Sequence, residues 1–173
     1  REMDNAGTLG RIYNAVWPQI DNRNFSYKVN NQKPHLFYIP DLQAIPYFER
    51  GNLDWALGIE KYFERIKKEV LANLDLEKDG EQYLSFGMSL AGADWDKIVG
   101  KMSWASVHLY KHGIANGDVI GKFPVLMEAL KDVPLATTHD NPSEVFISVL
   151  RPHTKIPPHF GVSNNVLTVH FPL

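Results

Sequence analysis

The chain has 173 residues, with 18 basic and 20 acidic side chains and a formal net charge of −2. This length suffices for one domain with a sizeable core, and the near-neutral balance gives no electrostatic reason to expect a nucleic-acid partner. Zero cysteines exclude disulfides and thiolate metal sites. No run reaches the about 18 apolar residues that a membrane span needs, and the N-terminus lacks a signal-peptide pattern, so we expect a cytoplasmic protein.

Two stretches have the spacing of amphipathic helices. In residues 8–17 apolar side chains recur every three to four positions, and Pro18 is expected to end that helix. A longer apolar stripe runs from Trp55 to Leu74, with Asn52 or Asp54 as candidate caps at its start. We expect this long helix to pack its stripe against a sheet and to serve as scaffold.

Shorter elements surround the long helix. The apolar run Leu36–Ile39 predicts a strand or extended segment, and Trp104–Tyr110 predicts a strand that closes with a turn at His112–Gly113. Residues 124–131 begin with a proline and predict a short helix. Residues 134–143 are expected to form a loop.

Two strands are predicted near the end of the chain. In Glu144–Leu150 the residues alternate, which makes Ser148 a lone hydroxyl among apolar neighbours on a strand expected to be buried on both sides. A buried hydroxyl requires a partner, either backbone or ligand. In residues 166–173 the alternation predicts that one set faces the core, so that Thr168 and His170 face a cavity or solvent.

The loop between these strands contains a candidate metal ligand. His159 follows Pro157-Pro158, whose fixed φ angles stiffen the backbone, and precedes Gly161, which lets another group approach closely. An imidazole in such a loop suits a metal site. A carboxylate at position 161 would have completed the first part of a two-His-one-carboxylate iron site, but glycine stands there. The spacing alone therefore leaves the role of His159 open.

The segment resembles a known family. Its residues read Ser148, then Arg151-Pro152-His153-Thr154, then Pro158-His159-Phe160-Gly161-Val162-Ser163-Asn164, and finally His170. This order is similar to the pattern of the aspartyl/asparaginyl β-hydroxylase family of Fe(II)- and 2-oxoglutarate-dependent dioxygenases. Elements upstream resemble the family as well, and they are the segments 33–42, 45–70, 104–113 and 123–130.

The resemblance implies a fold that is mainly β with packed helices, an α+β arrangement. It is a double-stranded β-helix, or cupin-like jelly roll, and the family pattern implies that it is incomplete in this chain. Residues 1–173 would form a single, partial domain. Within it residues 1–143 would be the helix-rich N-terminal portion, and residues 144–173 the first strands of the jelly-roll core.

The resemblance also implies a chemistry. His159 matches an iron ligand, while Ser148 and His170 match positions that contact the carboxylates of 2-oxoglutarate. Fe(II) would activate O₂ with 2-oxoglutarate as cosubstrate, and the substrate would be Asp or Asn in a peptide, a free amino acid or a small metabolite. Gly161 fits, because this family holds iron with two histidines and keeps glycine at that position. No further side chain is predicted to be catalytic.

Two departures from the family pattern stand out. Thr168 replaces an arginine that helps to bind 2-oxoglutarate in well-known members. The second iron-binding histidine and another arginine are expected beyond Leu173. The remaining histidines match no ligand position and are expected to be surface or structural residues: His35, His108, His112, His139 and His153.

Two other functions compete with the hydroxylase. A non-catalytic binding or scaffold domain that keeps the fold is the main alternative, because fold likeness does not establish activity. A zinc hydrolase that uses His159 and His170 is disfavoured, because the chain offers neither a plausible third ligand nor a nearby carboxylate base.

Overall fold

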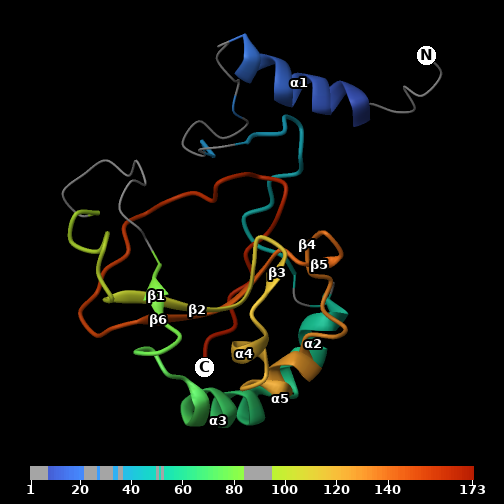
Figure 1. Cartoon of the computed structure of the whole chain (residues 1–173). Helices are drawn as coiled ribbons and strands as arrows, with labels where there is room; N and C mark the ends of the chain where they lie inside the picture. The colour runs from blue at the N-terminus through green and yellow to red at the C-terminus, as the bar shows by residue number, and fades with distance from the viewer. Residues whose placement is uncertain are drawn as a thin grey trace. The chain divides into compact units, whose positions relative to one another are not determined.

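The computed structural model describes residues 8–21, 27, 33–34, 37–49, 51, 53–83 and 95–173. The chain forms two compact units (Figure 1). Unit 1 comprises Arg1–Phe48 and Pro158–Pro172, and unit 2 comprises Glu49–Pro157 with Leu173. Helices and antiparallel strands occur together, so the mixed class expected from the sequence is confirmed at that level.

Unit 2 is built around one long strand. Strand β2 (Trp104–Lys111) pairs antiparallel with β1 (Glu81–Gln82) and β3 (Ile114–Ala115), and along its whole length with β6 (Glu144–Leu150). Valine, tryptophan, tyrosine and isoleucine favour these extended segments because their branched or aromatic side chains suit a pleated sheet. The strands predicted at 104–110 and 144–150 are thus confirmed.

The turn after β2 is also confirmed. His112 and Gly113 have φ angles of 53° and 78°, and together they join β2 to β3. Two successive positive φ angles give the backbone twist that a two-residue hairpin requires. Asn116 then caps α4 (Gly117–Ile120) by accepting a 3.3 Å hydrogen bond from the Val119 amide.

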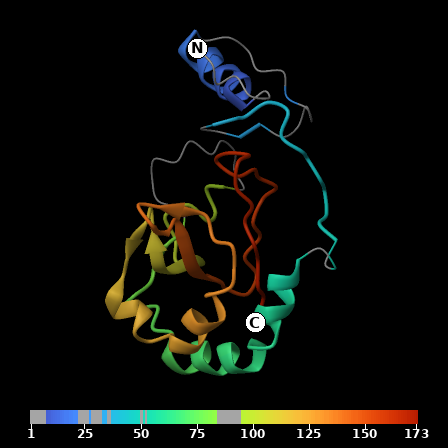
Figure 2. The ribbon, with the colours of Figure 1, turned by 90° about the vertical axis from the view of Figure 1, so that its right-hand side faces the viewer.

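One face of the sheet is the core of unit 2. Ala105, Val107 and Leu109 on β2 are fully buried. Helices α3 (Phe63–Asn73), α4 and α5 (Pro124–Ala129) gather on one side of the sheet in Figures 1 and 2. Their buried side chains, together with that of Phe123 at the N-cap of α5, are Ile66, Val70, Val119 and Ala129.

The expectation that the strand carrying Ser148 is buried on both sides is wrong. Strand β2 occupies the buried position instead, because it has partners along both of its edges. In the described sheet β6 pairs only with β2, and its side chains are half-buried or exposed. Ser148 itself is exposed.

The long helix predicted from Trp55 to Leu74 is two helices. Helix α2 (Asp54–Glu60) ends in a tightened turn, where the amides of Lys61 and Tyr62 bond three residues back to Gly58 and Ile59. Helix α3 then continues the same apolar stripe. The predicted cap at Asp54 is wrong, because Leu53 occupies the N-cap without a side-chain bond. Asn52 lies outside the described residues.

The other N-terminal prediction is also corrected. Helix α1 (Thr8–Ile20) contains Pro18 instead of ending before it. Proline removes one backbone donor in the last turn, and the Asp21 amide closes that turn with a 2.9 Å bond to the Trp17 carbonyl. A single missing bond so close to a helix end is tolerated.

Two further expectations concern loops and strands. Residues 134–143 contain a small hairpin, β4 (Thr137–Thr138) with β5 (Asn141–Pro142), where a loop was expected. The strand predicted at 166–173 is not formed, because these residues join no backbone ladder in the described part of the chain. Leu167 and Val169, expected to face a core, are 67% and 60% exposed.

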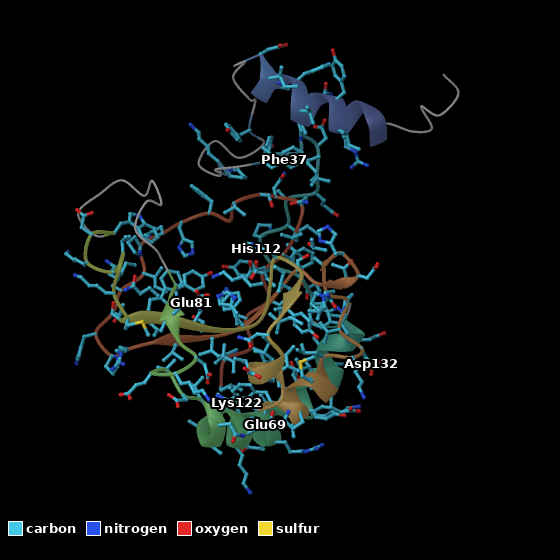
Figure 3. The ribbon with its side chains drawn as sticks, in the orientation of Figure 1. Phe37, Glu69, Glu81, His112, Lys122 and Asp132 are labelled. Carbon is cyan, nitrogen blue, oxygen red and sulfur yellow. The ribbon has the colours of Figure 1, made fainter. Side chains whose placement is uncertain are left out.

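Within unit 1, the segment around residue 38 contacts the loop after Gly161. Phe37, labelled in Figure 3, forms an isolated parallel bridge with Ser163, and its amide donates to the Val162 carbonyl at 3.1 Å. The extended segment predicted at Leu36–Ile39 is thus confirmed for its described residues, and Leu36 lies outside them. No helix in the described ranges has the length and apolar character to cross a membrane.

Candidate functional site

Ser148 lies exposed on β6 and is bonded to a buried side chain on β2. The Trp104 indole Nε1–H donates to Ser148 Oγ at 3.0 Å. Trp104 is buried and stacks on Tyr83, with ring centroids 3.9 Å apart and an interplanar angle of 12°. Burial raises the pKa of Tyr83, and the charge of Glu144 raises it further, so its phenol stays neutral. The Ser148 hydroxyl is therefore held by a hydrogen bond from an indole that is buried and stacked on Tyr83.

His159 lies in unit 1, in the loop that follows Pro157-Pro158. Its side chain is exposed. At Gly161 an added Cβ atom would lie 3.3 Å from the Ser163 carbonyl oxygen, so this oxygen would have to move by a few tenths of an ångström. Glycine thus permits the tight path of the backbone after His159, as the sequence predicted.

Asn164 fixes the end of this loop. Its Oδ1 accepts from the Ile39 amide and its Nδ2 donates to the Ile39 carbonyl, both at 2.8 Å. One amide side chain therefore satisfies both backbone groups of a residue 125 positions away. The contact joins two segments that each resemble the same family in sequence, the element at 33–42 and the His-x-Gly loop.

His170 and Thr168 follow in the same unit. Both side chains are exposed, but the alternation from which their exposure was predicted is absent, because residues on both sides of this segment are exposed. Ser148 belongs to unit 2, whereas His159 and His170 belong to unit 1. The grouping of these three side chains into one site stays a prediction.

The described part of the chain holds no complete metal site. Among residues 8–21, 27, 33–34, 37–49, 51, 53–83 and 95–173, no three His, Asp or Glu side chains gather closely enough to bind a metal ion. One exposed imidazole does not hold iron, so the residues present fit only part of an iron site.

The turn between β6 and the loop places one residue in the left-handed region. His153 has a φ of 63°, a value that glycine adopts most readily. The Thr154 amide closes the turn with a 3.2 Å bond to the Arg151 carbonyl.

A polar cluster that sequence reasoning missed lies on the Ser148 face of the sheet. His108 Nε2 is 3.1 Å from Glu81 Oε1, which also binds Lys111 Nζ at 2.5 Å. Glu144 Oε1 is 3.0 Å from His112 Nδ1, and Glu144 Oε2 is 3.5 Å from His108 Nδ1. The sequence predicted His108 as a surface or structural residue, and these contacts agree with the structural alternative. The partners from β1 and β6 arise only from strand pairing.

Burial sets the protonation of this cluster. Desolvation by burial lowers the pKa of His108 and is the largest effect. The negative charges of Glu81 and Glu144 act to raise this pKa, and the positive charge of Lys111 acts to lower it further. At 3.5 Å the Glu144 carboxylate attracts His108 Nδ1 without completing a hydrogen bond, and this buried nitrogen has no hydrogen-bond partner among the described residues. The ring is therefore held mainly in its neutral form.

A cavity adjoins the cluster. Its volume is about 670 Å³, and Glu81 and His112, labelled in Figure 3, border it together with His108 and Lys111. Ser106 Oγ lies 3.1 Å from His108 Nε2, an arrangement with the outline of a nucleophile and base. Ser106 is only 1% exposed, so no substrate reaches its hydroxyl, and the pair is structural.

Comparisons with known proteins identify the family. The model of the family described as Aspartyl/Asparaginyl beta-hydroxylase matches residues 60–173. The chain is 25% identical to Aspartate beta-hydroxylase domain-containing protein 2 of Xenopus tropicalis and of Homo sapiens, covering 95% of this chain and 42% of each relative. The Rattus norvegicus protein of the same name is 26% identical, with 95% of this chain and 46% of the relative covered.

The chain therefore spans less than half the length of these curated relatives. No solved structure matches it. The family match covers well over half of the chain, including the Ser148 strand, the His159 loop and His170. The resemblance predicted from these motifs is confirmed, and the chain belongs to the aspartyl/asparaginyl β-hydroxylase family.

Proposed function

We propose that this chain is part of an Fe(II)- and 2-oxoglutarate-dependent hydroxylase that acts on an amino-acid side chain. The substrate class is Asp or Asn in a peptide, a free amino acid or a small metabolite. The observation that carries the proposal is the Asn164 contact with Ile39, because it joins two separate family elements and holds the end of the loop that carries His159. Membership of a hydroxylase family supports the same reaction class.

In this proposal each predicted residue has one role. His159 binds the iron, and Ser148 and His170 bind the carboxylates of 2-oxoglutarate. Ser148 is suited to its role because the residue is exposed and its hydroxyl accepts a hydrogen bond from a buried indole. Iron and 2-oxoglutarate, once bound, supply the O₂ activation that hydroxylation of an unactivated carbon requires. The chain's own residues bind and orient the iron and the 2-oxoglutarate, and they keep water out of the site.

The proposed fold is a double-stranded β-helix in which β2 and β6 are core strands. Residues 1–143 form its helix-rich portion, and residues 144–173 contribute its first strands, all within one domain.

A non-catalytic binding domain with the same fold is the second candidate. The observation that favours it is Thr168, whose short neutral side chain cannot provide the charge-assisted contact that an arginine gives to a carboxylate. The two candidates differ in turnover but not in structure.

Turnover separates the two candidates. The native protein that carries this chain is incubated with Fe(II), O₂ and 2-oxoglutarate, and succinate is measured. We expect succinate formation, its loss in His159→Ala and its retention in His112→Ala, which removes another exposed histidine (79% exposed side chain). Equal turnover in the wild type and His159→Ala would exclude the proposed role of His159. No turnover in the wild type would favour the binding domain.

A further inference from the structure

One edge of the sheet in unit 2 is interrupted beside His108. Strand β6 pairs with β2 along its whole length, so β1 and β3 share the opposite edge of β2. Strand β1 pairs with residues 105–106 and β3 with residues 110–111. Residues 107–109 therefore have no strand partner on that edge of the described sheet. The cavity of about 670 Å³ is lined by residues from both sides of this break.

The walls of this cavity differ in chemistry. Ile114 and Ala115 of β3 form an apolar wall, and Ile114 is 73% exposed. Three carboxylates line the cavity, those of Asp79, Glu81 and Asp118. Lys111 carries the one ammonium group among the described residues that line it. The cavity thus combines an aliphatic surface with an excess of negative charge, and a hollow of this kind attracts cations.

Two of the three carboxylates already have a cationic partner. Lys111 Nζ lies 2.5 Å from Glu81 Oε1. Lys122 Nζ lies 2.5 Å from Asp79 Oδ2, and the Asp79 side chain is only 7% exposed. Asp118 is exposed in the first turn of α4, and its carboxylate has no hydrogen bond or ion pair with the described residues. Asp118 is therefore the carboxylate that a ligand can pair with.

We propose that this cavity binds an alkylammonium or guanidinium cation, with its charged head at Asp118 and its aliphatic stem against Ile114 and Ala115. Such a ligand pairs the remaining carboxylate and covers the apolar wall at the same time. The volume lies within the about 300–1,000 Å³ typical of small-molecule sites. A free diamine and a basic side chain of a peptide share this chemistry. The site lies within unit 2 and does not depend on the proposed hydroxylase activity.

Two molecules of equal chain length and different charge test this site. The native protein, labelled with ¹⁵N, is titrated with the five-carbon diamine cadaverine and with pentanediol, which has hydroxyls in place of both amino groups. Ionic strength is held constant, because salt screens exposed charges. We expect cadaverine at millimolar concentration to shift the amide signals of residues 114–118, and pentanediol to leave them unchanged. No saturable shift with cadaverine, or an equal shift with pentanediol, would overturn the inference.

Asp118→Asn removes the charge and keeps the shape of the side chain. We expect it to weaken cadaverine binding about two- to fivefold, the range for an exposed ion pair. The matched control is Asp132→Asn, which changes an exposed aspartate outside the cavity lining, labelled in Figure 3, and should leave the affinity unchanged. Equal losses in the two variants would reflect net charge alone and would contradict a site at Asp118.

Lys111→Gln should change the affinity in the opposite direction. This substitution removes the ammonium group that pairs with Glu81, so a second carboxylate becomes available to the ligand. We expect cadaverine binding to strengthen about two- to fivefold. General damage to the cavity would weaken binding instead, and an unchanged or weaker affinity would overturn the electrostatic account of this site.

A last comparison identifies the source of the cation. The native protein is titrated with N-acetyl-lysine methylamide and with its uncharged counterpart N-acetyl-norleucine methylamide. Binding of the lysine compound supports the site as a receptor for a basic peptide side chain. Binding of cadaverine without the lysine compound supports a free amine as the ligand. Equal binding of the norleucine compound would overturn the role of the positive charge.

Discussion

Replacing Asn164 with alanine should release the loop that follows His159. The side chain makes two 2.8 Å hydrogen bonds to the Ile39 backbone, both partly buried. Each bond contributes about 0.5–1.5 kcal/mol net, so the loss amounts to about 1–3 kcal/mol for local opening. By the usual conversion this raises the open fraction by about 5- to 150-fold.

Hydrogen exchange reads this opening at one amide. The Ile39 N–H donates to Asn164 Oδ1, so its exchange rate should rise by at least about fivefold in Asn164→Ala. Asn164→Asp should be no better, because it keeps an acceptor but places a carboxylate oxygen against the Ile39 carbonyl. Asn165→Ala, the exposed neighbour, should leave the rate unchanged. Unaltered Ile39 exchange in Asn164→Ala would refute the reasoning.

Three further predictions concern unit 2, each read from urea unfolding. The Glu69 carboxylate of α3 accepts hydrogen bonds from two backbone amides at the start of α5, at 2.8 and 2.9 Å. Glu69→Ala should therefore lower the free energy of unfolding by about 2 kcal/mol, and the exposed control Glu77→Ala by less than about 0.5 kcal/mol. Equal losses in the two variants would contradict the capping role of Glu69. Gly113→Ala should lower the free energy of unfolding by about 2 kcal/mol or more, because φ is +78° and the new Cβ would lie 2.4 Å from the Thr138 carbonyl oxygen. The control Gly58→Ala, in a helix and with open space around it, should raise the free energy of unfolding by up to about 1 kcal/mol. If Gly58→Ala were the more destabilising of the two, the backbone strain at Gly113 would be ruled out. Burial lowers the folded pKa of His108 below its unfolded value of about 6.5, so the neutral ring's contribution to the free energy of unfolding is complete above about pH 6.5 and is lost as the pH falls from there through the lower folded pKa. His108→Gln should therefore reduce the dependence of the free energy of unfolding on pH below about 6.5. An unchanged dependence would disprove the lowered pKa of His108.

Local sequence signals predicted the two longest strands, β2 and β6, but missed the hairpin of β4 and β5 and predicted a strand at 166–173 that is not formed. Branched and aromatic residues identified β2 and β6, and the His112–Gly113 turn follows from backbone chemistry that glycine tolerates. The break between α2 and α3 was missed because the apolar stripe runs through it without interruption. Periodicity reports which side faces the core, and it does not report a single tightened turn.

The errors and omissions share a different cause. Whether β6 or β2 is buried depends on how many partners each strand has, which its own residues do not encode. The same holds for contacts between distant segments, such as Asn164 with Ile39 and Glu69 with the start of α5. For the site, the family motif identified Ser148 as a candidate, but its support by Trp104 required the strand register.

Binding of iron and 2-oxoglutarate tests the central claim most directly. The native protein that carries this chain is mixed anaerobically with Fe(II) and 2-oxoglutarate, and the weak visible charge-transfer band of the chelated keto acid is recorded. The account predicts a band in the wild type and in His112→Ala, and none in His159→Ala. A band of full strength in His159→Ala would contradict the claim that His159 binds the iron.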